Sequence, residues 1–449
     1  MAEAVPGRPL VSVIIATYNW STALHCALRS VLLQSFGNFE VLVIGDGCTD
    51  ESEAVVRSFS DARLRWQNLP ENSGSQSAPN NRGFALAAGE FIAYLGHDDI
   101  WYPTHLQSLV TVMEARAADL AIGTAMIYGA PESGVRLVSG LFDPAGFTLR
   151  DFAPPSSFML RRSLLERIGP WRDPAGLSAP VDYDLLRRAL EAGAAFAGTG
   201  ELTVFKFNAA FRRDAYRRKE IGEQQAMLAR IETGIDFRQE EWAALVRCFL
   251  TGRAWPMSVA GNINDLPLGG VHARNRLFKG LDAGGPAPRF EALAEPRRWP
   301  LTEIDALGFE WHELEEAPKF GSFRWSGPST VSTLHLPVSA EQDLTIEIHI
   351  LYAIATETLA GLHLSLNGVS VGGTIDPTGH GSFLLRTQYR AAAAVTDRDG
   401  VKVAIRLPRT LSWHQLGRGT DARPVGIAVN WVQARPIDTS AAPPLPSAP

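Results

Sequence analysis

The chain has 449 residues, which is enough for two or three domains. Its hydrophobic content of 45% and charged content of 20% are ordinary for a globular protein, and its net charge of −6 gives no reason to expect a nucleic-acid partner. No apolar run approaches the roughly 20 residues that span a bilayer, and residues 1–9 lack a signal-peptide pattern. The three scattered cysteines favour reduced thiols and a cytoplasmic location.

The first part of the chain alternates between predicted strands and helices. Residues 11–16 are a β-branched run typical of a strand buried on both faces. After a short loop, Ser21 is a good N-cap for a helix whose apolar residues recur at helical spacing and which ends at Gly37. A second strand at 39–44 and a second helix repeat the pattern. This alternation predicts a parallel sheet with right-handed crossovers.

Polar residues follow these strands. Asp46 stands directly after the second strand, where it can accept hydrogen bonds from a base or ribose, although Asp46–Gly47 alone is also typical of a plain turn. Residues 70–83 are rich in small and amide side chains, which suits a loop closing over phosphates. Arg82 would supply charge to that loop, or it would pair with a carboxylate.

An acidic pair follows the apolar run at 91–95. The like charges of Asp98 and Asp99 repel unless a cation or a donor-rich ligand lies between them. Ligands of open α/β sheets bind at this edge, so we predict a divalent-metal and nucleotide-sugar site at both aspartates; a solvated turn is the plain alternative. The neighbouring His97 is interpreted as structural or solvated, with a metal or ribose contact as the alternative.

A third polar cluster lies at residues 179–188. Asp182 falls at or before the first turn of a predicted helix, where a carboxylate is stabilised by free N–H groups, so helix capping explains this residue by its position alone. Lys206, in a strand pair predicted at 195–207, would face a diphosphate or be structural.

A charged amphipathic helix is predicted at 211–231. Its basic cluster would be a solvated face or, as an alternative, a peripheral contact with anionic lipid; the cluster comprises Arg212, Arg213, Arg217, Arg218 and Lys219.

Short alternating runs begin near Gly308 and are typical of an antiparallel β-sandwich. The predicted strands are Thr333–Val338, Leu344–Leu351, Leu362–Asn367, Ser382–Gln388, Val401–Leu407 and Val425–Val432. We therefore expect an α/β domain at 1–235, a partly helical linker at 236–307, an all-β sandwich at 308–436 and a disordered tail at 437–449. Sandwich aromatics form the core or stack on sugars; the candidates are Trp325, Trp413 and Trp431.

Five motifs, in order and spacing, resemble glycosyltransferase family 2, the inverting enzymes with the GT-A fold, whose central sheet is Rossmann-like and mostly parallel. They are Val-Ser-Val-Ile-Ile-Ala-Thr-Tyr-Asn (11–19), Asp-Gly-Cys-Thr-Asp (46–50), Asn-Asn-Arg-Gly (80–83), Gly-Glu-Phe-Ile-Ala-Tyr-Leu-Gly-His-Asp-Asp-Ile-Trp-Tyr-Pro (89–103) and Val-Asp-Tyr-Asp-Leu (181–185). The resemblance implies that the pocket for the base and ribose is lined by Thr17, Asn19 and Asp46.

The resemblance also implies the chemistry. Asp98 would hold Mn²⁺ or Mg²⁺, with Asp99 beside it, and the donor would be a nucleoside diphosphate sugar. Asp182 would take the proton from the acceptor hydroxyl, with Asp184 as a weaker competitor facing elsewhere; the alternative is that Asp182 only caps its helix. The sandwich resembles accessory jelly-roll modules of bacterial surface-polysaccharide enzymes in residues 323–327, 366–368 and 421–428. The expected acceptor is accordingly a bacterial surface glycan or a lipid-linked saccharide.

Three positions depart from the family pattern. Gly96 stands where an aspartate is frequent, Val181 where a glutamate precedes the base, and Asn80 where an arginine is frequent. These departures leave a non-catalytic, glycan-binding scaffold with a decayed transferase domain as the alternative. A nucleotidyltransferase is disfavoured because the loop at 17–20 is neither Gly-rich nor basic.

Overall fold

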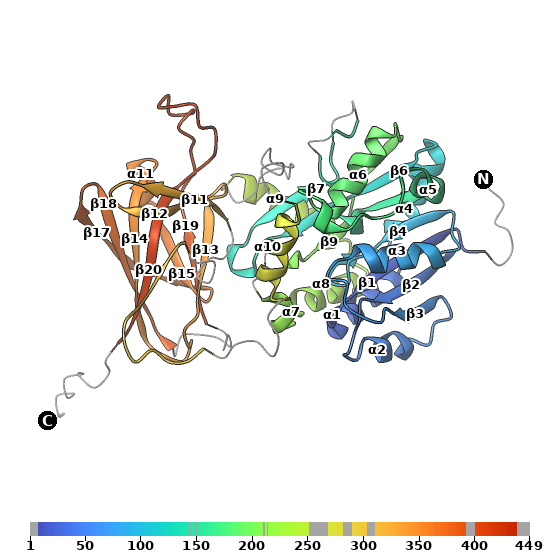
Figure 1. Ribbon diagram of the computed structural model, residues 1–449, viewed down its shortest axis with the longest axis horizontal. Helices are drawn as coiled ribbons and strands as arrows, with labels where there is room; N and C mark the ends of the chain where they lie inside the picture. Colours follow the sequence, from blue (N-terminus) through green and yellow to red (C-terminus); the bar gives the residue numbers. More distant parts are fainter. Residues whose placement is uncertain are drawn as a thin grey trace. The chain divides into compact units, whose positions relative to one another are not determined.

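The chain forms two compact units in the computed structural model (Figure 1). The first comprises Met1–Gly129, Arg136–Val246 and Trp255–Pro286, and the second comprises Ala130–Val135, Arg247–Ala254 and Ala287–Pro449. The structure describes residues 8–142, 146–148, 151–209, 212, 214–250, 268–281, 290–302, 310–391 and 400–437. Most of the predicted tail, 438–449, and Arg213 of the basic cluster lie outside these residues.

The first unit is built on a mixed sheet with the strand order β3-β2-β1-β4-β8-β6-β9-β5, in which β7 pairs with β6. Strands β3, β2, β1 and β4 are mutually parallel, β6 is parallel to β9, and β8 runs antiparallel between β4 and β6. The strands are β1 (Val11–Thr17), β2 (Phe39–Gly45), β3 (Leu64–Asn68), β4 (Phe91–Tyr94), β5 (Ile100–Trp101), β6 (Leu120–Tyr128), β7 (Arg136–Ser139), β8 (Phe158–Arg161) and β9 (Phe196–Lys206). The predicted α/β class is confirmed, and so is the parallel pairing of strands β1 to β4.

Helices connect these strands and pack against them. They are α1 (Ser21–Leu32), α2 (Ser52–Ser58), α3 (Ser77–Leu86), α4 (His105–Ala115), α5 (Arg162–Ile168), α6 (Val181–Glu191), α7 (Ala215–Arg218), α8 (Gly222–Glu232), α9 (Arg238–Leu250) and α10 (Gly270–Lys279). Gly83 allows α3 to lie close to β1, because a Cβ there would be 2.5 Å from the Ile14 side chain. Among the described residues, no helix is both long and apolar enough to cross a membrane.

Four local predictions differ from the structure. Helix α1 was expected to end at Gly37 and ends at Leu32. The helix predicted at 211–231 is divided into α7 and α8, because Lys219 has a left-handed φ of 54° that ends α7. The strand pair predicted at 195–207 is the single strand β9. Helix α1 begins at Ser21 itself, and its first N–H donates to Asp50 Oδ2 at 2.9 Å, so a carboxylate from the next loop fills the role predicted for the Ser21 hydroxyl.

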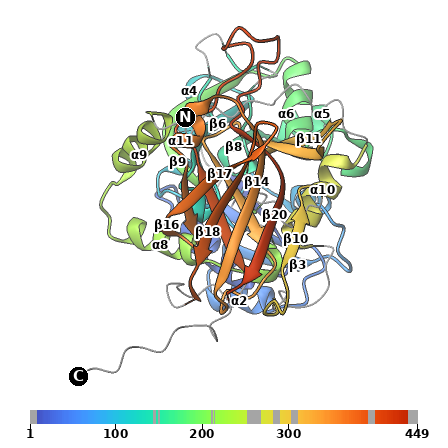
Figure 2. The same cartoon turned by 90° about the vertical axis from the view of Figure 1, so that its left-hand side faces the viewer.

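The second unit contains two antiparallel sheets, as expected for the sandwich. One has the order β11-β12-β20-β14-β18-β17, with β10 paired to β20, and the other has the order β13-β19-β15-β16. Figure 2 shows β17, β18, β14 and β20 side by side. The elements are β10 (Arg297–Pro300), β11 (Trp311–Ala317), β12 (Gly321–Ser326), β13 (Val331–Leu336), β14 (Leu344–Ala353), α11 (Thr356–Ala360), β15 (His363–Leu366), β16 (Val369–Val371), β17 (Gly373–Gly379), β18 (Ser382–Tyr389), β19 (Val401–Arg406) and β20 (Ile427–Pro436).

Alternating aliphatic residues of both sheets form the sandwich core, which includes Trp299 and Ile348. Trp325 is buried beside Phe323 and is a core residue. Trp431 is covered by His349, stacked with ring centroids 5.1 Å apart, and by Arg298. Neither indole is a free platform for a sugar.

Candidate active site

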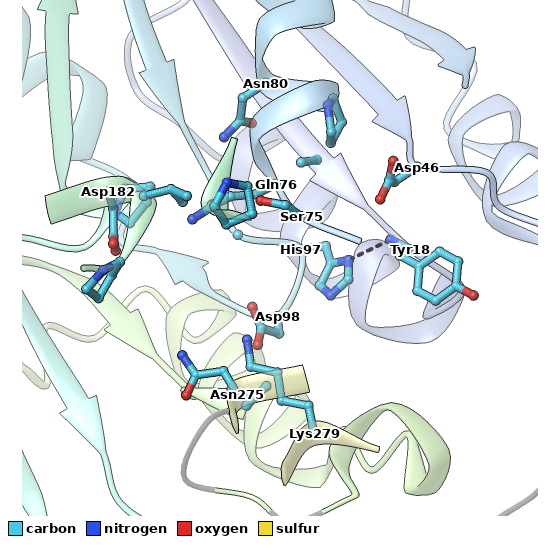
Figure 3. Close-up of a pocket in the computed structure, with 18 of the residues that line it drawn as sticks. Tyr18, Asp46, Ser75, Gln76, Asn80, His97, Asp98, Asp182, Asn275 and Lys279 are labelled. Carbon is cyan, nitrogen blue, oxygen red and sulfur yellow. Dashed lines mark hydrogen bonds between the residues drawn. The ribbon is translucent and has the colours of Figure 1, made fainter. Parts of the chain in front are cut away.

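A cavity of about 340 Å³ lies in the first unit at the carboxyl ends of β1, β2, β4 and β9 (Figure 3). Thr17 ends β1, Asp46 follows β2 and Asp98 follows β4, whereas Asp182 comes from the first turn of α6. All four line the cavity, and the first three do so because strands that run in the same direction end at the same edge. The described lining residues do not include three other predicted site residues, Asn19, Arg82 and Asp99.

Asp46 joins the end of β2 to the polar segment predicted to close over phosphates. Asp46 is 4% exposed, and its carboxylate accepts hydrogen bonds from Asn72 Nδ2 at 3.1 Å and from the backbone N–H of Ser73 at 3.0 Å. The segment therefore borders the cavity next to Asp46. A ligand hydroxyl or ring N–H at this end would meet a carboxylate that is already held in place.

His97 is a buried member of the cavity wall. Its Nδ1 accepts from the Tyr18 N–H at 3.4 Å and from the Thr17 hydroxyl at 2.8 Å, so in the neutral ring Nε2–H donates to the Tyr216 hydroxyl at 3.1 Å. Burial lowers the pKa of His97 below its ordinary value, in agreement with a neutral ring. With both nitrogens engaged, His97 orients Thr17 and Tyr216, in line with its structural interpretation.

The two members of the acidic pair have different surroundings. Asp98 faces the cavity, whereas Asp99 is fully buried, and its Oδ2 accepts from Lys206 Nζ at 2.8 Å and from Ser156 Oγ at 2.5 Å. Burial raises the pKa of Asp99 above its usual range against the opposing charge of Lys206. Burial also acts to raise the pKa of Asp98, but Lys206 and weaker neighbouring charges outweigh it and hold that pKa below its usual range.

The acidic pair offers few ligands to the expected divalent cation. Asp98 presents a carboxylate to the cavity, and Asp99 Oδ1 is buried without a hydrogen-bond partner among the described residues. The same residues contain no cluster of three His, Cys, Asp or Glu side chains that could hold a metal. A cation at Asp98 would therefore take most of its ligands from substrate phosphates and water, which is the usual mode of Mg²⁺.

Gly96 is closely packed behind the acidic pair. A Cβ at this position would lie 2.9 Å from Asp99 Oδ2 and 3.1 Å from Asp98 Oδ1. The aspartate that the family pattern favours here would therefore crowd two carboxylates and repel them. Glycine at position 96 leaves the acidic pair undisturbed, whereas any larger residue would have to displace its carboxylates.

Asp182 enters the cavity from the N-terminal turn of α6, where its Oδ1 accepts the N–H of Tyr183 at 3.0 Å. Burial raises the pKa of Asp182 above its ordinary value, while the Tyr183 N–H and Lys206 act in the opposite direction. A carboxyl group with a raised pKa is a better proton acceptor near neutral pH than an ordinary aspartate, which suits the predicted base.

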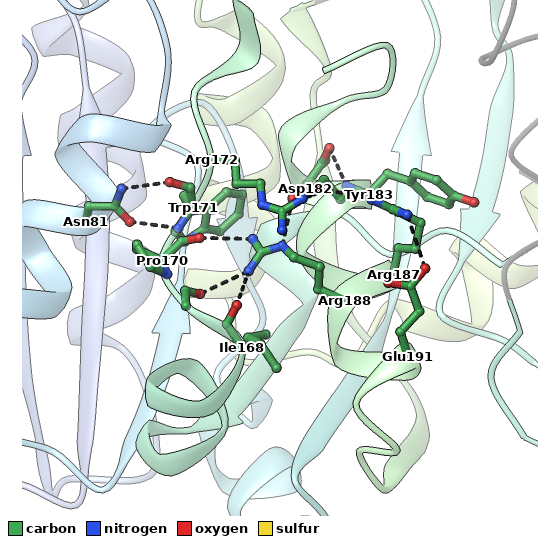
Figure 4. A network of polar contacts seen from close by, with 12 residues as sticks. Asn81, Ile168, Pro170, Trp171, Arg172, Asp182, Tyr183, Arg187, Arg188 and Glu191 are labelled. Carbon is green, nitrogen blue, oxygen red and sulfur yellow. Dashed lines mark hydrogen bonds and ion pairs between the residues drawn. The ribbon is translucent and has the colours of Figure 1, made fainter. Parts of the chain in front are cut away.

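A buried ion pair anchors the helix that carries Asp182 (Figure 4). Asp184 is 1% exposed, and Arg188 Nε donates to its Oδ2 at 2.8 Å. The rest of the Arg188 guanidinium donates to the carbonyls of Ile168, Gly169 and Pro170 at the end of α5. Asp184 is therefore structural, and its network fixes the position of α6 relative to α5.

Two predicted ligand contacts have structural partners outside the cavity lining. Asn19, with a positive φ of 43°, accepts through Oδ1 from the N–H groups of Thr49 at 2.7 Å and Asp50 at 3.3 Å, and so ties the loop after β1 to the loop after β2. Arg82 Nε donates to Gln67 Oε1 at 2.9 Å. Their contact with a donor nucleotide stays a prediction.

Helix α10 is a wall of the cavity that sequence reasoning missed, since residues 236–307 were expected to be a linker. The residues that it contributes include His272, Asn275, Arg276 and Lys279. These positions follow the spacing i, i+3, i+4 and i+7, so they share one helix face. Such a polar stripe was visible in the sequence, but the same pattern is typical of a solvent-facing helix.

The sheet order is that of a GT-A type fold, with the candidate site at the carboxyl edge of its parallel strands. Residues 12–169 match the model of glycosyl transferase family 2, and this part of the chain is a domain of that family.

Two curated relatives support this assignment. The chain is 30% identical over 174 residues to an uncharacterized glycosyltransferase of Nostoc sp., a match that covers 36% of this chain and 53% of the relative. It is 37% identical over 106 residues to UDP-Glc:alpha-D-GlcNAc-diphosphoundecaprenol beta-1,3-glucosyltransferase WfgD of Escherichia coli, covering 23% of this chain and 41% of that protein. The chain thus spans about half or less of the length of these relatives.

Among solved structures, TarS 1–349 of S. aureus is similar with a TM-score of 0.37 and 21% identity, covering 54% of this chain and 72% of that one.

Proposed function

We propose that the protein is a metal-dependent, inverting glycosyltransferase that moves a sugar from a nucleoside diphosphate sugar to a lipid-linked or surface-glycan acceptor. The observation that carries this proposal is that Asp46, Asp98 and Asp182 line one cavity at the edge of the sheet where ligands bind. The printed name of the E. coli relative, a glucosyltransferase acting on a diphosphoundecaprenol-linked sugar, supports the donor and acceptor classes.

The proposed roles follow from the positions of the side chains. Thr17 and Asp46 bind the nucleoside, and the segment next to Asp46 covers the phosphates. Asp98 holds Mg²⁺ or Mn²⁺, which when bound neutralises charge on the departing diphosphate. Asp182 removes the proton of the acceptor hydroxyl as its oxygen attacks the anomeric carbon, and the bonding electrons leave with the phosphate oxygen. Attack opposite to the leaving group inverts the anomeric configuration.

A cytoplasmic location, with peripheral contact to a membrane, is part of the same proposal. The three cysteines are all free thiols, in keeping with a reducing cytoplasm. Peripheral contact with a membrane, where a lipid-linked acceptor resides, is proposed through the basic cluster, although Arg212 pairs with Glu223 at 2.7 Å and is partly neutralised.

The experiment is a transfer assay over a panel of nucleotide sugars with Mn²⁺. Asp182→Asn should reduce transfer by at least about 100-fold while nucleotide binding persists, because the amide cannot accept the proton. Glu191→Gln, on the exposed part of the same helix, is the matched control and should keep wild-type activity. Full activity of Asp182→Asn would refute the base assignment, and failure of the wild type to bind any nucleoside diphosphate would favour the scaffold alternative.

A further inference from the structure

Helix α10 is held against the cavity at several points. The N–H of Gly269 donates to the carbonyl of Leu177 at 2.8 Å just before the helix begins. Arg276 Nη1 donates to the carbonyl of Gly74 at 2.9 Å, in the segment that also binds Asp46. At the other end, Gly280 lies directly against Arg217, where a Cβ would be 2.7 Å from Arg217 Cδ. The polar face of α10 is therefore placed firmly toward the cavity.

Two lysines reach the acidic pair, and they are in different states. Lys206 Nζ is bound to Asp99 at 2.8 Å, so its charge is already matched by a buried carboxylate. Lys279 lines the cavity and points toward Asp98 (Figure 3), but among the described residues its ammonium has neither a hydrogen bond nor an ion pair. Burial lowers the pKa of Lys279, with Asp98 opposing the shift.

Lys279 is partly buried, and a partly desolvated ammonium without a bound anion is stabilised when a ligand supplies that anion. An ammonium group acts as a point charge for phosphate, with three donors that rotate to meet its oxygens. Asp46 and Asp182 lie on opposite sides of the cavity (Figure 3), so a nucleoside diphosphate sugar between them would bring its phosphates near Asp98 and Lys279.

We propose that Lys279 is a ligand of the donor diphosphate and neutralises charge on it as the bond to the anomeric carbon breaks. This inference rests on the proposed function. Lys279 lies outside residues 12–169, the part of the chain that matches the family model, so the contact is contributed by a helix beyond that range.

The test compares binding of a nucleoside diphosphate with binding of its nucleoside. UDP, GDP, CDP, ADP and TDP are first titrated into the full-length wild type by calorimetry with Mn²⁺ and again with EDTA. The diphosphate that binds and its parent nucleoside are then titrated into Lys279→Met, Lys279→Arg and Lys319→Met, with ligand-observed NMR for the weak nucleoside. Lys319 is an exposed lysine of the second unit, outside the cavity lining, and serves as the control.

Lys279→Met should weaken diphosphate binding by about 10-fold or more, the usual effect of losing a charged hydrogen bond, and should leave nucleoside binding unchanged. Lys279→Arg should recover a large part of the diphosphate affinity, and Lys319→Met should match the wild type.

Equal diphosphate affinity in Lys279→Met and the wild type, or equal loss of nucleoside and diphosphate affinity, would overturn the inference and leave the proposed function standing. A wild type that binds none of the five diphosphates would overturn both.

Discussion

Lys206 at the end of β9 and Asp99 in the loop after β4 form an ion pair in which Nζ lies 2.8 Å from Oδ2, although 107 positions separate the two residues in the chain. The Lys206 side chain is 15% exposed and the Asp99 side chain is fully buried. This ion pair links the two strand ends that border the candidate active site, and it separates the roles of the two adjacent aspartates: Asp99 is held by protein groups and Asp98 faces the cavity.

Lys206→Met should destabilise the protein by about 3–5 kcal/mol, because it leaves the Asp99 carboxylate buried without its cation. Urea unfolding at neutral pH measures this loss. The double variant Lys206→Met/Asp99→Asn should lose less stability than the sum of the two single variants, since the charge and its partner are removed together. Additive losses would show that the pair is not coupled.

Transfer should depend on pH through Asp182. Its pKa is raised by burial, and only the ionised carboxylate can accept a proton, so kcat should rise as the pH increases through that raised pKa and fall on the acid side. In Asp182→Asn, the residual kcat should no longer fall on the acid side of the pH profile. An unchanged acid limb in that variant would assign the titration to another group.

Gly96→Asp should not restore a more typical metal site. The new side chain would begin 2.9 Å from Asp99 Oδ2 and would add a third carboxylate, so we expect a loss of about 1–3 kcal/mol and weaker transfer. Gly96→Ala separates crowding from charge and should be milder. Thermal unfolding and Mn²⁺ titration provide the measurements; a stable variant with tighter Mn²⁺ binding would contradict the packing argument.

His105 should make the first unit sensitive to acid. Burial lowers its pKa to about 3, and Nδ1 is hydrogen-bonded to Thr203 Oγ1 at 2.8 Å. In the unfolded chain the His105 ring takes up a proton at about pH 6.5. The contribution of the neutral His105 to the free energy of unfolding is therefore fully present above that pH and is lost as the pH falls toward 3, by up to about 5 kcal/mol.

His105→Phe keeps a ring against Trp101 and removes the titration. Its free energy of unfolding should be lower at pH 7 and should change less between pH 7 and pH 5 than that of the wild type. An identical acid response in the two proteins would mean that His105 does not titrate on unfolding.

The sequence alone determined the parallel strands β1, β2 and β4 and the candidate residues that follow them. Runs of β-branched residues form strands wherever they are buried, and helical crossovers make such strands parallel, so Thr17, Asp46 and Asp98 had to meet at one edge. The six sandwich strands predicted from alternation are present in the second unit for the same local reason.

Only the tertiary structure decided which partners those residues have. Asp50 rather than Ser21 caps α1, Lys206 neutralises Asp99, and α10 contributes Lys279 to the cavity. Each of these contacts joins segments that are distant in sequence or separated by a loop, and a residue's own propensity carries no information about which distant charge will lie beside it. Local preference fixes an element, whereas the neighbour of that element is selected by the packing of the whole unit.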